Sequence, residues 1–199
     1  KARQYDRRFF SRGIQPHVYA IVESNHVDQF ALEYFCNGDA KLKKAMDTII
    51  SELHDAKEYG SILTVTPQDW SALYARFAEI KEDIHISREV ALRGLLPLVQ
   101  VAEALAQKYD VIVTNPPYLG SSRFDAALDK YVKIYFQDVK ADLSMVMFKK
   151  MLSYQLKKNG FIAFITTSSW MFLSSFEKIR TTMFENASID SLVDFGTEL

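Results

Sequence analysis

Residues 111–118 constrain the fold more than any other stretch of this chain. The run Val111–Val113 is β-branched and has no helical period, which predicts a strand buried on both faces, as in parallel sheets. The strand is followed by Asn-Pro-Pro-Tyr. Each proline lacks an N–H and forces the preceding residue out of the helical region. We therefore expect the strand to stop in a rigid elbow, with Asn115 and Tyr118 at its carboxyl end, where open α/β sheets bind ligands.

The elbow carries a set of groups that suits one kind of chemistry. An amine conjugated to an aromatic ring, such as N6 of adenine, is a poor nucleophile because its lone pair is delocalised. Two acceptors, the Asn115 side-chain oxygen and the Pro116 carbonyl, can bind both of its N–H groups and draw the lone pair out of conjugation. Pro117 shapes the elbow, and the Tyr118 ring offers a stacking face worth ~1–3 kcal/mol per base. In a duplex the base must first be flipped out.

These residues resemble a known family. Asn115 to Tyr118 and the preceding strand resemble motif IV of the gamma-class N6-adenine DNA methyltransferases, which use S-adenosylmethionine as methyl donor. Three longer stretches, residues 1–8, 109–121 and 168–177, resemble the adenine-specific methyltransferases of BREX phage-exclusion systems.

The resemblance implies both a fold and a function. The fold would be α/β: a partial Rossmann-like methyltransferase fold, with a central, largely parallel sheet flanked by helices and a long helical insertion. The reaction would transfer a methyl group, without a metal, from S-adenosylmethionine to N6 of a flipped-out adenine in double-stranded DNA. Its purpose would be self-marking in a BREX or restriction-modification system, with other BREX defence proteins as partners.

Three alternatives remain open. One is a fused restriction-modification enzyme, which a nuclease motif upstream in the parent gene would identify. The glutamine methyltransferases that modify release factors share Asn-Pro-Pro-Tyr, because a side-chain amide is also a conjugated amine; the long helical insertion and the Ser-Ser-Trp stretch at 168–170 argue against them. The chain can also be a non-catalytic, protein-contact fragment of a defence complex.

Composition limits the remaining possibilities. The chain has 199 residues, 48% of them hydrophobic, which is enough for a substantial core. Its net charge of −1 gives no overall basic field to hold DNA. The single cysteine, Cys36, and the lack of a signal peptide or membrane-length apolar run favour the cytoplasm. The four histidines have no metal-ligand spacing, so we expect no metal site; they are His17, His26, His54 and His85.

The chain is expected to be a fragment, 1–199, of a longer catalytic domain. It begins with Lys1 rather than methionine, and its seven glycines are isolated, so no cofactor-binding Gly-rich loop is present. We therefore expect the chain alone to be inactive. Strands that lack their neighbours also leave open sheet edges, through which the fragment is expected to self-associate.

Within the fragment, residues 26–107 are expected to form a helical insertion and residues 108–199 a strand-helix-strand core. Residues 16–22 alternate as a short strand does, and the strand resembles the family's third strand, whose following polar residue contacts the cofactor's adenosine. Glu23 is that candidate, although a solvated carboxylate is an equal alternative. A helix capped at Thr66 and a helix from Ser87 to Gln107, kinked at Pro97, complete the insertion.

The core has three further predicted features. Asp142 is expected to cap a helix that stops at Lys157-Lys158-Asn159-Gly160, followed by a buried strand at 161–166 and a last strand at 189–195. The loop after the elbow carries Ser121 and Arg123, which can contact the DNA backbone or be merely solvated. Trp170 follows the 161–166 strand and either walls the base pocket or belongs to the core.

Overall fold

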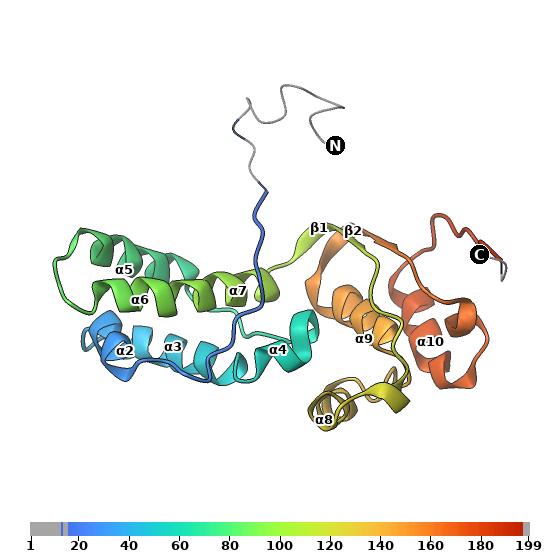
Figure 1. The fold of residues 1–199 in the computed structure, drawn as a ribbon. Coiled ribbons are helices and arrows are strands. Elements are labelled where there is room, and N and C mark those ends of the chain that lie inside the picture. Colours follow the sequence, from blue (N-terminus) through green and yellow to red (C-terminus); the bar gives the residue numbers. More distant parts are fainter. Residues whose placement is uncertain (1–12, 14–15, 197–199) are drawn as a thin grey trace.

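The computed structural model describes residue 13 and residues 16–196. The described chain is elongated, with a helical half that runs to residue 107 and a mixed half that holds both strands (Figure 1). The resemblance at residues 1–8 lies outside the described residues.

The helical half consists of two layers, α2, α3 and α4 below and α5, α6 and α7 above (Figure 1). Three aspartates start its helices: Asp28, Asp39 and Asp69 each accept backbone N–H groups of the first turn. Pro97 lies in the first turn of α7, where a missing N–H costs nothing, and so the expected kinked helix is divided at Leu95. The helices are α2 Gln29–Cys36, α3 Ala40–Glu52, α4 Ala56–Tyr59, α5 Trp70–Glu82, α6 Arg88–Gly94 and α7 Leu96–Ala106.

A continuous apolar core joins the two layers. The rings of Phe35 on α2 and Phe77 on α5 lie 4.5 Å apart, and both side chains are buried. Ile49 of α3 and Val99 of α7 are fully buried in the same cluster. The helical half therefore has a hydrophobic core of its own.

The mixed half is built on two parallel strands, β1 Tyr109–Thr114 and β2 Leu156–Phe164. Between the strands the chain forms α8 Ala126–Tyr135, α9 Leu143–Lys150 and a π-helical turn, Met151–Gln155. After β2 come two 3-10 turns, Ser168–Met171 and Ser174–Phe176, and α10 Glu177–Asn186. A second core lies between α8, α9 and α10 and includes Val132, Val146 and Ile179.

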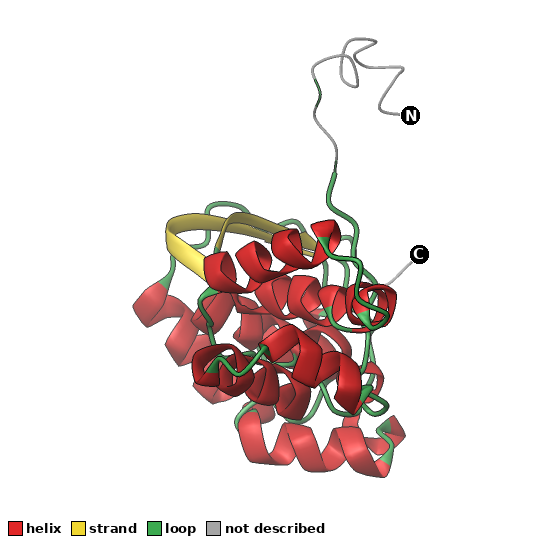
Figure 2. Cartoon of the chain, turned by 90° about the vertical axis from the view of Figure 1, so that its left-hand side faces the viewer, coloured by secondary structure: helices red, strands yellow, loops and turns green. Residues whose placement is uncertain are grey.

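The sheet is covered on one face. Helices lie beneath the strand pair (Figure 2), and Phe164 of β2 packs on Phe148 of α9 with ring centroids 5.3 Å apart. The other face is exposed: Val111 is 58%, Val113 75% and Phe161 67% accessible. The prediction of a strand buried on both faces is therefore wrong, because among the described residues the second face has no covering layer.

Two predicted strands do not form. Residues 16–22 and 189–195 do not form strands, and all of their side chains are exposed or half-buried. Alternating patterns predict which face of a strand is apolar, but a strand exists only where a neighbour completes its hydrogen bonds. In the described part of the chain, the sheet consists of β1 and β2.

Two predicted boundaries also differ. The strand β2 starts at Leu156, so the expected stop signal lies inside the strand as an irregularity: Tyr109 pairs with Leu156, and Val111 with Phe161. Asn159 takes a left-handed φ of 64° there. The helix expected to be capped at Thr66 begins at Trp70, because Asp69 is the N-cap. Thr66 instead donates its N–H to the carboxylate of Glu52 across 2.9 Å.

The two halves are joined by packed aromatic and polar contacts. Tyr59 of α4 stacks on Tyr131 of α8 at 4.6 Å. Lys150 at the end of α9 is 2% exposed, and its Nζ donates to Thr64 Oγ1 at 3.1 Å. Burial lowers the pKa of the Lys150 ammonium to about 8. These contacts fix the helical half against α8 and α9.

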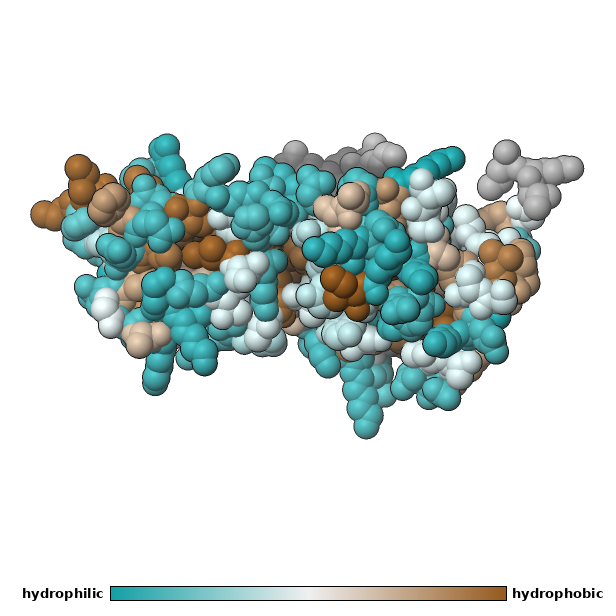
Figure 3. All heavy atoms as spheres, turned by 90° about the horizontal axis from the view of Figure 1, so that it is seen from below, coloured by the Kyte–Doolittle hydropathy of each residue, from teal (hydrophilic) through white to brown (hydrophobic). Residues whose placement is uncertain are grey.

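The surface of the helical half is mainly hydrophilic from below, but hydrophobic side chains gather at the end farthest from the strands (Figure 3). The α5–α6 connection contributes Ile84, 100% exposed, and Ile86, 91% exposed. In the part of the chain that the structure describes, no helix has the length and apolar character needed to cross a membrane.

Candidate functional site

The Asn-Pro-Pro-Tyr elbow follows β1 directly. Pro116 is buried, whereas Asn115, Pro117 and Tyr118 are exposed. The Tyr118 hydroxyl donates a hydrogen bond to Asn115 Oδ1 across 2.7 Å. The buried proline thus anchors the elbow, and the amide and the aromatic ring are presented together to solvent.

The loop after the elbow is fixed to the start of α9. The N–H of Leu143 donates to the Leu119 carbonyl, and the N–H of Ser121 donates to the Ala141 carbonyl, both at 2.9 Å. Asp142 caps α9 as predicted, accepting from the N–H of Ser144 at 2.8 Å. The N-terminus of α9 therefore holds the backbone of the residues that follow Tyr118.

The loop after β2 reaches the same place. The N–H of Ile165 donates to the Thr114 carbonyl at 3.3 Å, which continues the parallel pairing up to the elbow. The hydroxyl of Thr166 lies 3.4 Å from the Ser144 hydroxyl, and Ser144 is fully buried. Because parallel strands end at one edge of the sheet, the two loops flank a shared region at the start of α9.

The other predicted substrate-binding residues lie on these two loops. Ser121 and Arg123 form an exposed 3-10 turn, Ser121–Arg123. Trp170 lies in the turn after β2 and is half-buried against the core of the mixed half. The structure therefore places all three on the loops that leave the same edge as Asn115.

One residue near these loops forms contacts that the sequence did not predict. Arg180 of α10 donates from Nη1 to the carbonyls of Trp170 and Leu173, each at 2.7 Å. The contacts join a helix to an irregular loop seven and ten residues earlier, a spacing that no periodic pattern reports.

Glu23 lies elsewhere, next to the helical half. Its carboxylate accepts from Lys57 Nζ at 3.0 Å, and the described residues before it form no strand. A residue that contacts the cofactor's adenosine is expected at the end of a strand, with its oxygens free. The arrangement seen at Glu23 does not fit that role.

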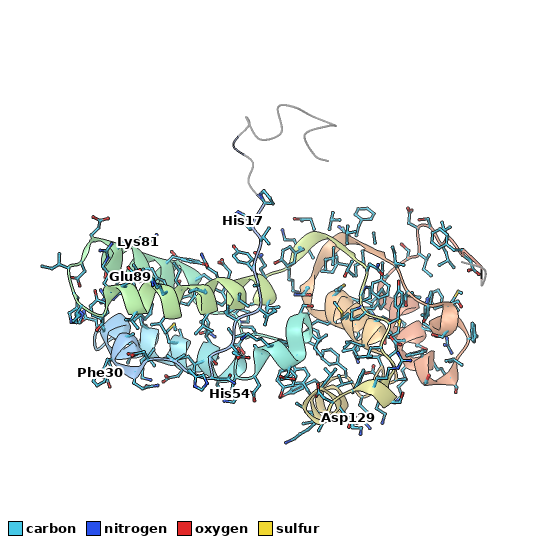
Figure 4. The ribbon with its side chains drawn as sticks, in the orientation of Figure 1. His17, Phe30, His54, Lys81, Glu89 and Asp129 are labelled. Carbon is cyan, nitrogen blue, oxygen red and sulfur yellow. The ribbon has the colours of Figure 1, made fainter. Side chains whose placement is uncertain are left out.

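The described residues contain no group of three or more His, Cys, Asp or Glu side chains that could hold a metal ion. The histidines are dispersed: His17 stands on the extended segment above the helices and His54 on the lower layer (Figure 4). His54 Nδ1 lies 2.9 Å from a carboxylate oxygen of Asp55.

Comparison of the sequence with known protein families identifies the class of protein to which the chain belongs. Residues 27–199 match the family model described as "Eco57I restriction-modification methylase". The chain belongs to this family of methylases.

Two relatives have names that are more specific than that of the family. The chain is 31% identical, over 98% of its length, to the adenine-specific methyltransferase BrxX of Escherichia coli O9:H4 (strain HS). It is 30% identical, over 92% of its length, to the adenine-specific methyltransferase PglX of Lacticaseibacillus casei (strain Zhang). The resemblance to the BREX methyltransferases is thereby confirmed. The chain spans 18% of the first relative's length and 16% of the second's.

A methylase needs a methyl donor, and cofactor-binding loops in α/β folds are typically Gly-rich turns after a strand. The strand β1 is followed by the proline elbow and β2 by a Thr-Thr-Ser-Ser-Trp loop, so neither strand leads into a Gly-rich turn. The candidate cofactor-binding residue predicted from the sequence, Glu23, instead forms an ion pair with Lys57.

Proposed function

We propose that this chain is the acceptor-binding segment of a DNA methyltransferase that transfers a methyl group from S-adenosylmethionine to N6 of a flipped-out adenine in double-stranded DNA. The observation that carries the proposal is the exposed Asn115–Tyr118 pair at the carboxyl end of a parallel strand. The relatives' names, both adenine-specific methyltransferases, favour DNA over a protein glutamine as the acceptor.

The amine would be held by two oxygens. Asn115 Oδ1 has two lone pairs, of which the Tyr118 hydroxyl occupies one, so the other remains for an amine N–H. The Pro116 carbonyl accepts no hydrogen bond from the described residues and supplies the second acceptor. Together they pull the nitrogen lone pair out of conjugation and aim it away from the base plane.

The base would be held by aromatic and polar groups. The Tyr118 ring is 46% exposed and offers a face for stacking. Trp170 forms the wall of the pocket on the side of the β2 loop, and Ser121 and Arg123 contact the DNA backbone. Phosphate contacts of this type set the register of the duplex without reading its sequence.

The donor would be held outside this chain. A complete Rossmann-like sheet, of which β1 and β2 are two neighbouring strands, would provide the cofactor loop from other segments of a longer, cytoplasmic protein. In that protein residues 26–107 form an insertion and residues 108–199 the core. The methyl mark would serve self-recognition in a BREX or restriction-modification system, and other BREX proteins would be partners.

The test uses the full-length protein with labelled S-adenosylmethionine and host DNA, and reads the product base by base. We expect the label at N6 of adenine in one sequence context. Label on a protein glutamine would favour the release-factor type of methyltransferase. No transfer by a protein that binds the cofactor would favour the protein-contact role.

A further inference from the structure

Arg180 is bound to the backbone of a loop. Its Nη1 donates to the carbonyl oxygens of Trp170 and Leu173, both at 2.7 Å, from a half-buried position on α10. Among the described residues it forms no ion pair with a carboxylate, so its charge is directed at these two carbonyls. Hydrogen bonds from a guanidinium are roughly twice as strong as those between neutral groups.

The loop held by Arg180 is otherwise closed by local bonds. The N–H of Leu173 donates to the Ser169 carbonyl at 3.0 Å. The hydroxyls of Thr167 and Ser169 lie 2.8 Å apart. Arg180 ties this closed turn to α10 at two carbonyls, three residues apart, so the turn cannot rotate about a single attachment.

The same loop borders the acceptor site. It leaves β2 directly after the Ile165–Thr114 hydrogen bond. Thr166 lies next to the buried Ser144, whose hydroxyl donates to the capping carboxylate of Asp142. The turn Ser168–Met171 carries Trp170, whose ring packs against the core of the mixed half. The orientation of Trp170 relative to the elbow therefore depends on where Arg180 holds the turn.

We propose that Arg180 is a positioning residue for base capture: by holding the turn Ser168–Met171 at two carbonyls, it keeps Trp170 in place as a wall of the pocket for the flipped adenine. The inference rests on the proposed function and adds a specific role to it. Arg180 touches neither donor nor acceptor, so its removal should disturb capture of the base and leave donor binding unchanged.

The experiment compares three variants of the full-length protein. Arg180→Gln removes the charge, Arg180→Lys keeps the charge without the planar fork, and Arg93→Gln is the matched control. Arg93 lies on α6 with its side chain 81% exposed, paired to Glu89. The readouts are kcat and KM for DNA, the dissociation constant for S-adenosylmethionine, and the fluorescence of a duplex that carries 2-aminopurine at the target adenine, which brightens when the base leaves the stack.

We expect Arg180→Gln to raise the KM for DNA about 10-fold and to weaken the 2-aminopurine signal, with cofactor affinity within about 2-fold of wild type. Arg180→Lys should recover part of both losses, and Arg93→Gln should match wild type. If Arg180→Gln does not fold, Arg180→Lys becomes the test of the inference, and we expect it to raise the KM for DNA about 3-fold.

A folded Arg180→Gln protein with wild-type KM and wild-type 2-aminopurine signal would overturn the inference. So would an equal loss of cofactor affinity, which is the mark of a general structural defect. Failure of this inference can be distinguished from failure of the proposed function. If the proposed function is wrong, the wild-type protein itself places no methyl group on adenine.

Discussion

The hydroxyl of Tyr118 donates to Oδ1 of Asn115 across 2.7 Å, so the ring proposed to stack on the base and the oxygen proposed to accept from the amine are coupled before any substrate arrives. The prolines between them fix the backbone, and this bond fixes the side chains. Such a pair is preorganised: little conformational entropy remains to be lost when the base enters.

Asn115→Ala should lower methyl transfer by about 100-fold or more, as removal of an oxyanion-hole donor does in other enzymes. The substitution removes one of the two proposed amine acceptors and leaves the buried Pro116 in place. The measurement is kcat in the full-length protein, with Asn186→Ala as the control, since Asn186 is exposed at the end of α10. Near-normal turnover of Asn115→Ala would remove the assigned role.

At Tyr118, the contributions of the ring and of the hydroxyl to catalysis can be measured separately. Tyr118→Phe keeps the stacking face and loses only the bond to Asn115, so we expect about a 2- to 10-fold reduction in kcat/KM. Tyr118→Ala loses the stacking face, worth ~1–3 kcal/mol, or about 5- to 150-fold. Steady-state kinetics of both variants tests this order. Equal effects would mean that the ring does not stack on the base.

Local chemistry explains what the sequence could predict. The cap at Asp142 and the strand before the elbow follow from residues within one helical turn or one strand, and the structure has both of them. The Asn-Pro-Pro-Tyr elbow is of the same kind, because prolines restrict their own neighbourhood.

The errors concern contacts between distant segments. Burial of Val111 and Val113 depends on a second layer of helices, and the residue pattern alone does not say whether that layer exists. The start of β2 at Leu156 depends on pairing with Tyr109. Arg180 could not be found in advance because its partners lie on an irregular loop.

The irregularity in β2 gives a stability prediction. A Cβ on Gly160 would lie 2.8 Å from the Asp110 carbonyl oxygen and 2.8 Å from Leu156 Cδ1. Gly160→Ala should therefore lower the free energy of unfolding by ~1–3 kcal/mol. Gly94→Ala is the matched control: it meets nothing within 4 Å in helix α6 and should stabilise by up to ~1 kcal/mol. Denaturant unfolding measures both, and equal behaviour of the two variants would contradict the close approach at Gly160.

Lys150 gives a pH-dependent prediction. Burial lowers its pKa in the folded state to about 8, against an ordinary value of 10.5. Between these pH values the unfolded state binds more protons, so this group makes the free energy of unfolding rise with pH. Below about pH 8 both states are protonated, and the cost of the buried charge is present in full, at most roughly 3 kcal/mol.

Replacing Lys150 should remove that cost. Lys150→Met keeps an unbranched side chain and should raise the melting temperature at pH 7 by several degrees, with a smaller gain at pH 9.5. Thermal unfolding at the two pH values is the measurement. Lys178→Met, at an exposed position on α10, is the control and should change little at either pH. A gain that is equal at both pH values would show that the ammonium is not the cause.

The open sheet gives the last prediction. Among residues 13 and 16–196, β1 and β2 form a two-stranded sheet whose edges have no further strand, and its uncovered face exposes Val111, Val113 and Phe161. Unpaired edges and apolar faces both favour pairing with another copy. We expect the isolated chain to self-associate in a concentration-dependent manner by light scattering. Val113→Lys places a charge on this face and should shift the equilibrium toward monomer, whereas Val90→Lys, on the helical half, should not. A wild-type chain that stays monomeric at every concentration would mean that edges and face are protected within the chain itself.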